Sequence, residues 1–184
     1  SVVFLEDYKV TLSELLMPAS EISEQISLAG TEASGTGNMK LMLNGAITMG
    51  TYDGANVEIH GAVGDENIFI FGMDTPEVNE LKARGYFPEQ IYNNNGLIKQ
   101  IIDLMYKGIN GATFEEVANT LRHTDRYMCF ADFDSYRGTQ AKASETYRDK
   151  YLWNKMSLMN ISGAGIFSAD RSVEDYARDI WKLN

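Results

Sequence analysis

Residues 32–45 of the chain read EASGTGNMKLMLNG, and the rest of the sequence is organised around this stretch. Two glycines, two hydroxyl side chains and an asparagine precede a run of good helix formers, and the closing Asn-Gly pair is a helix stop signal. We therefore predict a loop that enters a short helix near Thr36 and leaves it near Gly45. Such a helix start offers unpaired N–H groups to an anion such as phosphate. Lys40 lies about one turn into the helix.

This loop suits a ligand that carries both a phosphate and an aldehyde. Gly35 and Gly37 have no Cβ atom, so a ligand can approach the backbone closely, and lysine forms Schiff bases with carbonyl compounds, including pyridoxal phosphate. The apolar neighbours of Lys40 favour a site shielded from water, where the reactive neutral amine is favoured. The ordinary alternatives are an exposed helix lysine and a Thr36 that only caps the helix.

Two common glycine-rich motifs do not fit this loop. Gly30 and Gly35 have the spacing of a nucleotide-binding P-loop, but Thr36 follows where that motif requires lysine. A dinucleotide fingerprint would need a third glycine where Lys40 stands. The sequence therefore argues against nucleotide binding through this loop.

Composition restricts the function further. The 184 residues predict one domain, 44% of them are apolar, and the net charge of −10 disfavours nucleic acid as a partner. No apolar run approaches the roughly 20 residues that span a bilayer, and no signal peptide is visible. The single Cys129 and two histidines provide no disulfide and no zinc site, so we expect no metal. No Gly-x-Ser-x-Gly elbow is present. We expect a cytoplasmic protein without a membrane partner.

Strand patterns are concentrated in the first part of the chain and helical patterns in the rest. Strands are predicted at residues 2–5, 24–27, 46–51 and 67–72. Helices are predicted at residues 11–17, 75–84, 97–105, 132–147, 150–160 and 172–181, and a further helix starts at residue 113. A break is predicted at residues 162–165. Early strands interleaved with helices predict an α/β fold with a parallel sheet.

Several segments carry a resemblance that spans nearly the whole chain. They read FLEDY at 4–8, SEQIS at 23–27, GTYDGANVE at 50–58, FIFGM at 69–73, HTDR at 123–126 and FSADR at 167–171. Together with EASGTGNMK they resemble, in order and without large gaps, the α-glucan phosphorylases, the family that acts on glycogen, starch and maltodextrin.

The resemblance implies a fold and an activity. The fold would be a Rossmann-like parallel sheet with helices on both faces and a helical C-terminal tail, part of the second domain of a GT-B-type two-domain glycosyltransferase. Residues 1–184 would be a single, N-terminally truncated domain, and Ser1 is not a natural start. The parent enzyme would cleave α-1,4-glucan ends with inorganic phosphate and release glucose 1-phosphate, and this fragment alone would be inactive.

The resemblance also implies roles for particular residues. Lys40 would form the Schiff base with pyridoxal phosphate. The other cofactor residues would be Thr36 and Gly37, at the phosphate, and Tyr8, in the pocket. The residues that bind glucosyl hydroxyls would be Glu32, Ser34 and Gly35.

Partners follow from the same resemblance, and alternatives stay open. The N-terminal part of the same enzyme would complete the site, and the full-length protein would be a homodimer. A stand-alone module that binds a phosphorylated small molecule is one alternative. A folded interaction domain with a vestigial loop is another. For Glu32 a solvated loop acid, and for Tyr8 an ordinary buried tyrosine, are the plain alternatives.

Overall fold

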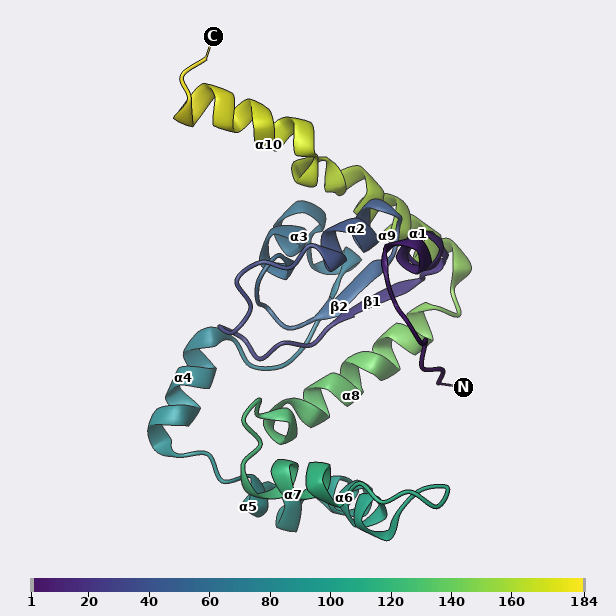
Figure 1. Ribbon diagram of the computed structural model, residues 1–184, viewed down its shortest axis with the longest axis vertical. Helices are drawn as coiled ribbons and strands as arrows, with labels where there is room; N and C mark the ends of the chain where they lie inside the picture. The colour runs from purple at the N-terminus through teal and green to yellow at the C-terminus, as the bar shows by residue number, and fades with distance from the viewer. Residues whose placement is uncertain (1, 184) are drawn as a thin grey trace.

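Three short parallel strands lie at the centre of this computed structural model, which describes residues 2–183 (Figure 1). The strands, which neighbour one another in chain order, are β1 (Ile22–Gln25), β2 (Ile47–Gly50) and β3 (Phe69–Ile70). The helices that connect them are α2 (Gly37–Leu43) and α3 (Asn56–Val63). Parallel neighbours need such crossover connections. The predicted α/β fold with a parallel sheet is confirmed.

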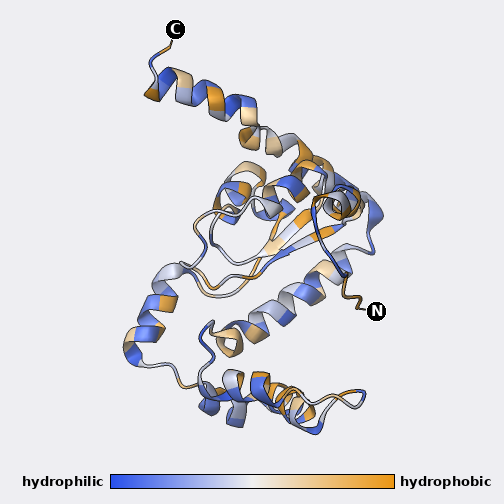
Figure 2. Ribbon diagram, viewed as in Figure 1, coloured by the Kyte–Doolittle hydropathy of each residue, from blue (hydrophilic) through white to orange (hydrophobic). Residues whose placement is uncertain are grey.

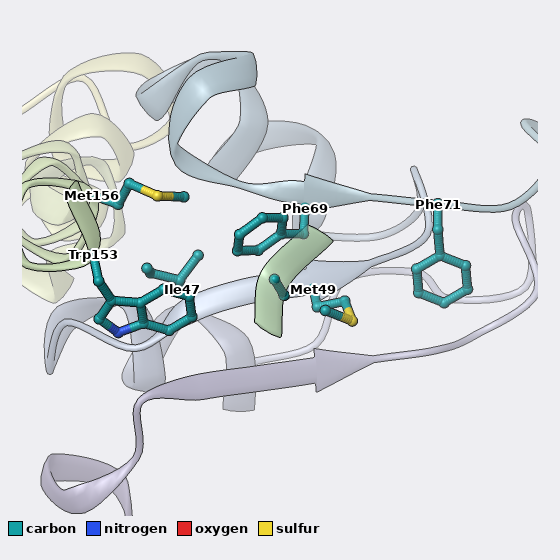
Figure 3. Packing of buried hydrophobic residues seen from close by; sticks show 7 residues of the cluster. Ile47, Met49, Phe69, Phe71, Trp153 and Met156 are labelled. Atoms are coloured by element: carbon teal, nitrogen blue, oxygen red, sulfur yellow. The ribbon is translucent and has the colours of Figure 1, made fainter. Parts of the chain in front are cut away.

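Helices cover both faces of this sheet, as predicted. Successive strand side chains point to opposite faces. Ile47, Met49 and Phe69 pack against Trp153 and Met156 of α9 (Lys150–Gly163) (Figure 3). The opposite face carries a second cluster, formed by Met42, Ile59, Val63, Ile68 and Ala164. The sheet is therefore buried on both sides.

A separate helical unit lies beyond the sheet, and α8 (Cys129–Thr146) returns the chain from it (Figure 1). Its helices are α4 (Thr75–Arg84), α5 (Pro88–Asn94), α6 (Gly96–Lys107) and α7 (Glu115–His123). Tyr92, Ile98, Ile102 and Ala118 form its core with Phe130 of α8. The predictions of α4 and α6 are confirmed, whereas α5 was missed because its polar, asparagine-rich sequence lacks an apolar stripe.

The C-terminal residues form a helical tail, as predicted. After α9 come the 3₁₀ turn η2 (Ala164–Phe167), α10 (Ala169–Asp175) and the π-helical turn η3 (Tyr176–Ile180). The α-helix α9 ends at Gly163, within the predicted break at residues 162–165, but the backbone continues there as a 3₁₀ turn and not as a loop. Figure 1 shows α10 extending away from the sheet, and in Figure 2 polar and apolar segments alternate along it.

The first predicted strand, at residues 2–5, is wrong. These residues form no strand, and the side chain of Phe4 is 89% exposed. A strand requires a neighbour for its backbone N–H and C=O groups, and no described strand lies beside this segment. Tyr8 therefore does not lie at a strand end. Ser1 lies outside the described residues.

The helix that follows, α1 (Val10–Ala19), was predicted to stop before Pro18 but includes it in its last turn. Proline disfavours helical backbone at the residue before it. This is a preference and not a prohibition, and in α1 the backbone before Pro18 is helical. Within the described residues, no helix is both long and apolar enough to cross a bilayer.

The start of α4 gives a first testable expectation. The Asp74 carboxylate accepts the Glu77 N–H at 2.9 Å and the Glu77 carboxylate accepts the Asp74 N–H at 2.9 Å. Replacing Asp74 with alanine removes this capping box, so we expect the free energy of unfolding to fall by about 1 kcal/mol. Urea denaturation measures this decrease in the free energy of unfolding. Glu80→Ala, on the exposed face of the same helix, is the control, and an equal loss in both variants would contradict the capping role.

Candidate functional site

The predicted loop and helix at residues 32–45 are present, with α2 starting at Gly37. The backbone N–H of Lys40 donates to the Thr36 carbonyl at 3.1 Å, which closes the first turn. The Thr36 hydroxyl makes no capping hydrogen bond. Among residues 2–183 no acceptor receives the N–H of Gly37 or Asn38. The start of α2 therefore keeps free donors.

Lys40 is exposed, so the expectation that its apolar neighbours shield it is wrong. Asn38 and Met42 lie four residues apart on one helix face and are buried, with 3% and 0% exposure. Lys40 lies midway between them in sequence and therefore projects from the opposite face. There it lines a hollow of about 410 Å³ between α1 and α2. Its side-chain amine, Nζ, makes no hydrogen bond or ion pair with another described residue.

Glu32, Ser34 and Gly35 lie together in a second hollow of about 150 Å³, at the carboxyl end of β1. The structure thus brings the three predicted sugar-binding residues together but places Lys40 in a separate hollow. Tyr8 lines neither hollow and is 59% exposed. The order of the strands explains the position of the second hollow, because the loops after β1 and β2 meet at the same edge of the sheet.

Asp53 anchors the loop before Glu32, and sequence reasoning missed this role by treating residues 52–55 as a turn only. Its carboxylate accepts the N–H groups of Gly30 and Glu32 at 2.9 Å each. It also accepts the Thr31 N–H at 3.3 Å and the Ser27 hydroxyl at 3.1 Å. An acidic residue three positions after the end of a buried strand and directly before glycine was the available signal, since the carboxyl ends of neighbouring parallel strands lie together.

The residue after Asp53 holds the same loop by close contact. The backbone at Gly54 has a φ of +49°, and a Cβ atom there would lie 2.5 Å from the Ser34 carbonyl oxygen. The next N–H, that of Ala55, donates to this carbonyl at 2.8 Å. Only glycine allows this approach. The turn after β2 therefore fixes the backbone path of the loop after β1 by direct contact.

Asn56 ties α2 to the same turn. Its side-chain oxygen accepts from the Asn38 amide at 2.8 Å, and its own amide donates to the Thr51 carbonyl at 2.9 Å. The Thr51 hydroxyl in turn donates to the Ser27 carbonyl at 2.6 Å. Buried polar groups are paired in this way because leaving them unpaired is costly. The network fixes the start of α2 relative to the ends of β1 and β2.

The Asp53 carboxylate should make stability depend on pH. Burial alone raises its pKa, but its four hydrogen bonds outweigh burial and hold the pKa of Asp53 below its usual value. With a lowered folded-state pKa, its contribution is present above the unfolded-state pKa of about 3.9 and disappears as pH falls through the folded-state value. We expect urea midpoints to fall more steeply between pH 5 and pH 3 in the original chain than in Asp53→Asn. Equal slopes would contradict this.

Comparison with known proteins decides the family. The family model described as carbohydrate phosphorylase matches residues 1–183. The chain belongs to the carbohydrate phosphorylase family. It is 46% identical over 186 residues to the glycogen phosphorylase of Synechocystis sp., covering 99% of this chain. It is 48% identical to the muscle form of Mus musculus, over 98% of this chain, and 48% to the liver form of Bos taurus, also over 98%.

This chain spans 22% of the length of each of these relatives. Membership of the carbohydrate phosphorylase family is consistent with a GT-B-type domain, and the parallel sheet with helices on both faces agrees with it. The resemblance seen in the sequence is thereby confirmed for the family. The roles of individual residues in the two hollows are proposals, developed next from their contacts.

Proposed function

We propose that this chain is the cofactor-anchoring part of an α-glucan phosphorylase. The whole enzyme would cleave α-1,4-glucan ends with inorganic phosphate and release glucose 1-phosphate. The observation that carries the proposal is Lys40, projecting unpaired from the first turn of α2 in a chain of the carbohydrate phosphorylase family. The relatives named above are called glycogen phosphorylases, which supports the glucan as substrate class.

The residues at the start of α2 suit pyridoxal phosphate. Lys40 Nζ is an unpaired primary amine in an open hollow and would hold the cofactor covalently. The uncapped Thr36 hydroxyl and the free Gly37 N–H would donate to its phosphate. The space where a Gly37 Cβ would stand has no atom within 4 Å, so nothing blocks this side. When bound, the cofactor supplies a phosphate group that acts as an acid–base partner for the substrate phosphate.

The second hollow suits the glucosyl unit. Glu32 is exposed, and within residues 2–183 its carboxylate accepts only the Ser34 N–H, at a long 3.3 Å. A sugar hydroxyl can replace this weak contact, because a charged acceptor forms stronger hydrogen bonds. Ser34 and Gly35 supply further polar groups beside it. Asp53 holds the backbone N–H of Glu32, so the carboxylate would be presented from a fixed position.

The chain alone lacks a full set of groups for the reaction. Two phosphate groups held close together repel each other strongly unless cations surround them. Lys40 is the one lysine or arginine lining its hollow, and Glu32, Glu24 and Asp53 give the second hollow a negative character. We infer that other parts of a longer polypeptide provide the missing cations, and that these 184 residues alone are one domain without phosphorolytic activity. A cytoplasmic location and a homodimeric full-length enzyme belong to the same proposal.

A reconstitution experiment tests the proposal. The longer enzyme that contains this chain, incubated with glycogen, phosphate and pyridoxal phosphate, should release glucose 1-phosphate, and removal of the cofactor should abolish the release. Absence of activity in the loaded enzyme would overturn it. Cofactor retention without activity would instead favour a module that only binds a phosphorylated ligand.

A further inference from the structure

A third cavity, of about 230 Å³, lies at the start of α8, on the α8 side of the carboxyl end of β1, and it shares Ile26 with the hollow of Glu32. It shares no lining residue with the hollow of Lys40. Its aromatic walls are Phe71, Tyr127, Phe133 and Tyr136, and the apolar surface is completed by aliphatic side chains that follow β1. Figure 3 shows Phe71 beyond the end of β3, at the opposite end of the same buried cluster from Trp153.

One carboxylate, that of Asp132, lines this apolar cavity. Asp132 is 8% exposed, which is unusual for a charged side chain. Its Oδ1 accepts the Met73 N–H at 2.8 Å, whereas its Oδ2 accepts no hydrogen bond within residues 2–183. No described lysine, arginine or histidine forms an ion pair with it. Oδ2 is not among the fully buried polar atoms that lack a partner, so it remains accessible from the cavity and can accept a hydrogen bond from an entering donor.

Further carboxylates lie around Asp132 and add negative charge to the cavity. Burial, together with the charges of Glu77 and Asp125, raises the pKa of Asp132. The hydroxyl of the wall residue Tyr136 donates to Glu24 at 3.1 Å. None of these carboxylates forms an ion pair with a described basic residue. The cavity thus lies in a locally negative field, which favours a positively charged occupant.

The other polar groups of the cavity do not change this charge. Burial raises the pKa of Cys129 to about 11, so its thiol is neutral at pH 7. The Arg126 guanidinium lies 5.7 Å from the centre of the Tyr127 ring, which shows that this wall already accepts a cation on one aromatic face. Among the groups that line the cavity, Oδ2 of Asp132 is therefore the negatively charged atom that can contact a bound cation.

We propose that this cavity binds a small protonated amine with an apolar body, with the ammonium group at Asp132 and the hydrocarbon part between the aromatic walls. A charge-assisted hydrogen bond to Oδ2 and cation–π contact with the rings would act together. The volume is below the roughly 300 Å³ at which pockets for drug-sized ligands begin, so one ring with a short side chain is the expected size. The inference does not depend on the proposed phosphorylase activity.

Two matched probes test the cation. Phenethylamine is protonated at pH 7, and 2-phenylethanol has the same shape without the charge. Isothermal titration calorimetry at pH 7 measures the binding of each probe to the 184-residue chain. We expect the amine to bind approximately tenfold more tightly than the alcohol. Equal affinities would overturn the amine assignment, and absence of binding heat at saturating amine would overturn the site.

Two variants on the same helix test the carboxylate. Asp132→Asn keeps an oxygen for the Met73 N–H but removes the charge, so the preference for the amine should disappear. Asp134→Asn removes a charge from the exposed side of α8, outside the cavity, and should leave the preference unchanged. Persistence of the tenfold preference in folded Asp132→Asn, or its loss in Asp134→Asn, would contradict the proposal. The comparison of the two probes on the unchanged chain stands even if one variant misfolds.

Discussion

Replacing Lys40 with alanine is expected to abolish covalent attachment of pyridoxal phosphate and to lower the turnover of the complete enzyme by about a thousandfold or more. The reason is chemical, because the proposal makes this amine the attachment point and no other described lysine or arginine lines its hollow. Mass spectrometry after borohydride reduction measures the attachment, and release of glucose 1-phosphate measures the turnover.

The matched control for this change is Lys155→Ala. Lys155 lies on the exposed side of α9 and makes no ion pair with a described residue. The Lys155→Ala variant should retain both covalent attachment of pyridoxal phosphate and normal turnover. Normal turnover in Lys40→Ala, or cofactor trapped on a different lysine in the original chain, would contradict the assignment of the anchor.

Replacing Asp53 with alanine is expected to have the largest effect on stability among the changes considered. It would leave three backbone N–H groups and the Ser27 hydroxyl without their acceptor. Removing a partly buried carboxylate from such a set costs about 3 to 5 kcal/mol of unfolding free energy. Since small domains are stable by about 5 to 15 kcal/mol, this is a large share. Urea denaturation measures the loss.

Local hydrogen exchange separates this effect from general destabilisation. In Asp53→Ala the amides of Gly30, Thr31 and Glu32 should exchange much faster than amides of β2, because they lose their acceptor directly. Glu66→Ala, which removes an exposed carboxylate near the end of α3, should change stability by less than about 0.5 kcal/mol. Uniform acceleration of exchange along the chain would show that Asp53 does not anchor this loop in particular.

The sequence predicted best those elements whose signals are local. Glycine, threonine and asparagine around residues 35–45 define the limits of α2, and the Thr-Pro-Glu start of α4 defines its capped end. Strand β2 was also found from its apolar and β-branched composition, and in the structure it has a partner strand on each side. The segment at residues 2–5 has the same composition but forms no strand. Strand formation depends on a neighbour, which composition does not report.

The sequence predicted which residues lie at the site, but not the contacts that hold them in position. The loop residues Glu32, Ser34 and Gly35 do lie together, since they are close in sequence. The exposure of Lys40 follows from the helix face set by Asn38 and Met42, which depends on where the sheet lies. The role of Asp53 depends on contacts between segments 21 to 26 residues apart. Such pairings follow from strand order and not from a local pattern.

The close fit of Gly54 against the Ser34 carbonyl has a consequence for ligand binding. The loop is already ordered in the free chain, because the turn after β2 determines its path. The conformational entropy of these residues is therefore lost during folding and not at the moment of association. A sugar entering this hollow should meet a preorganised surface, so that variants which loosen the turn would weaken the affinity chiefly through faster dissociation.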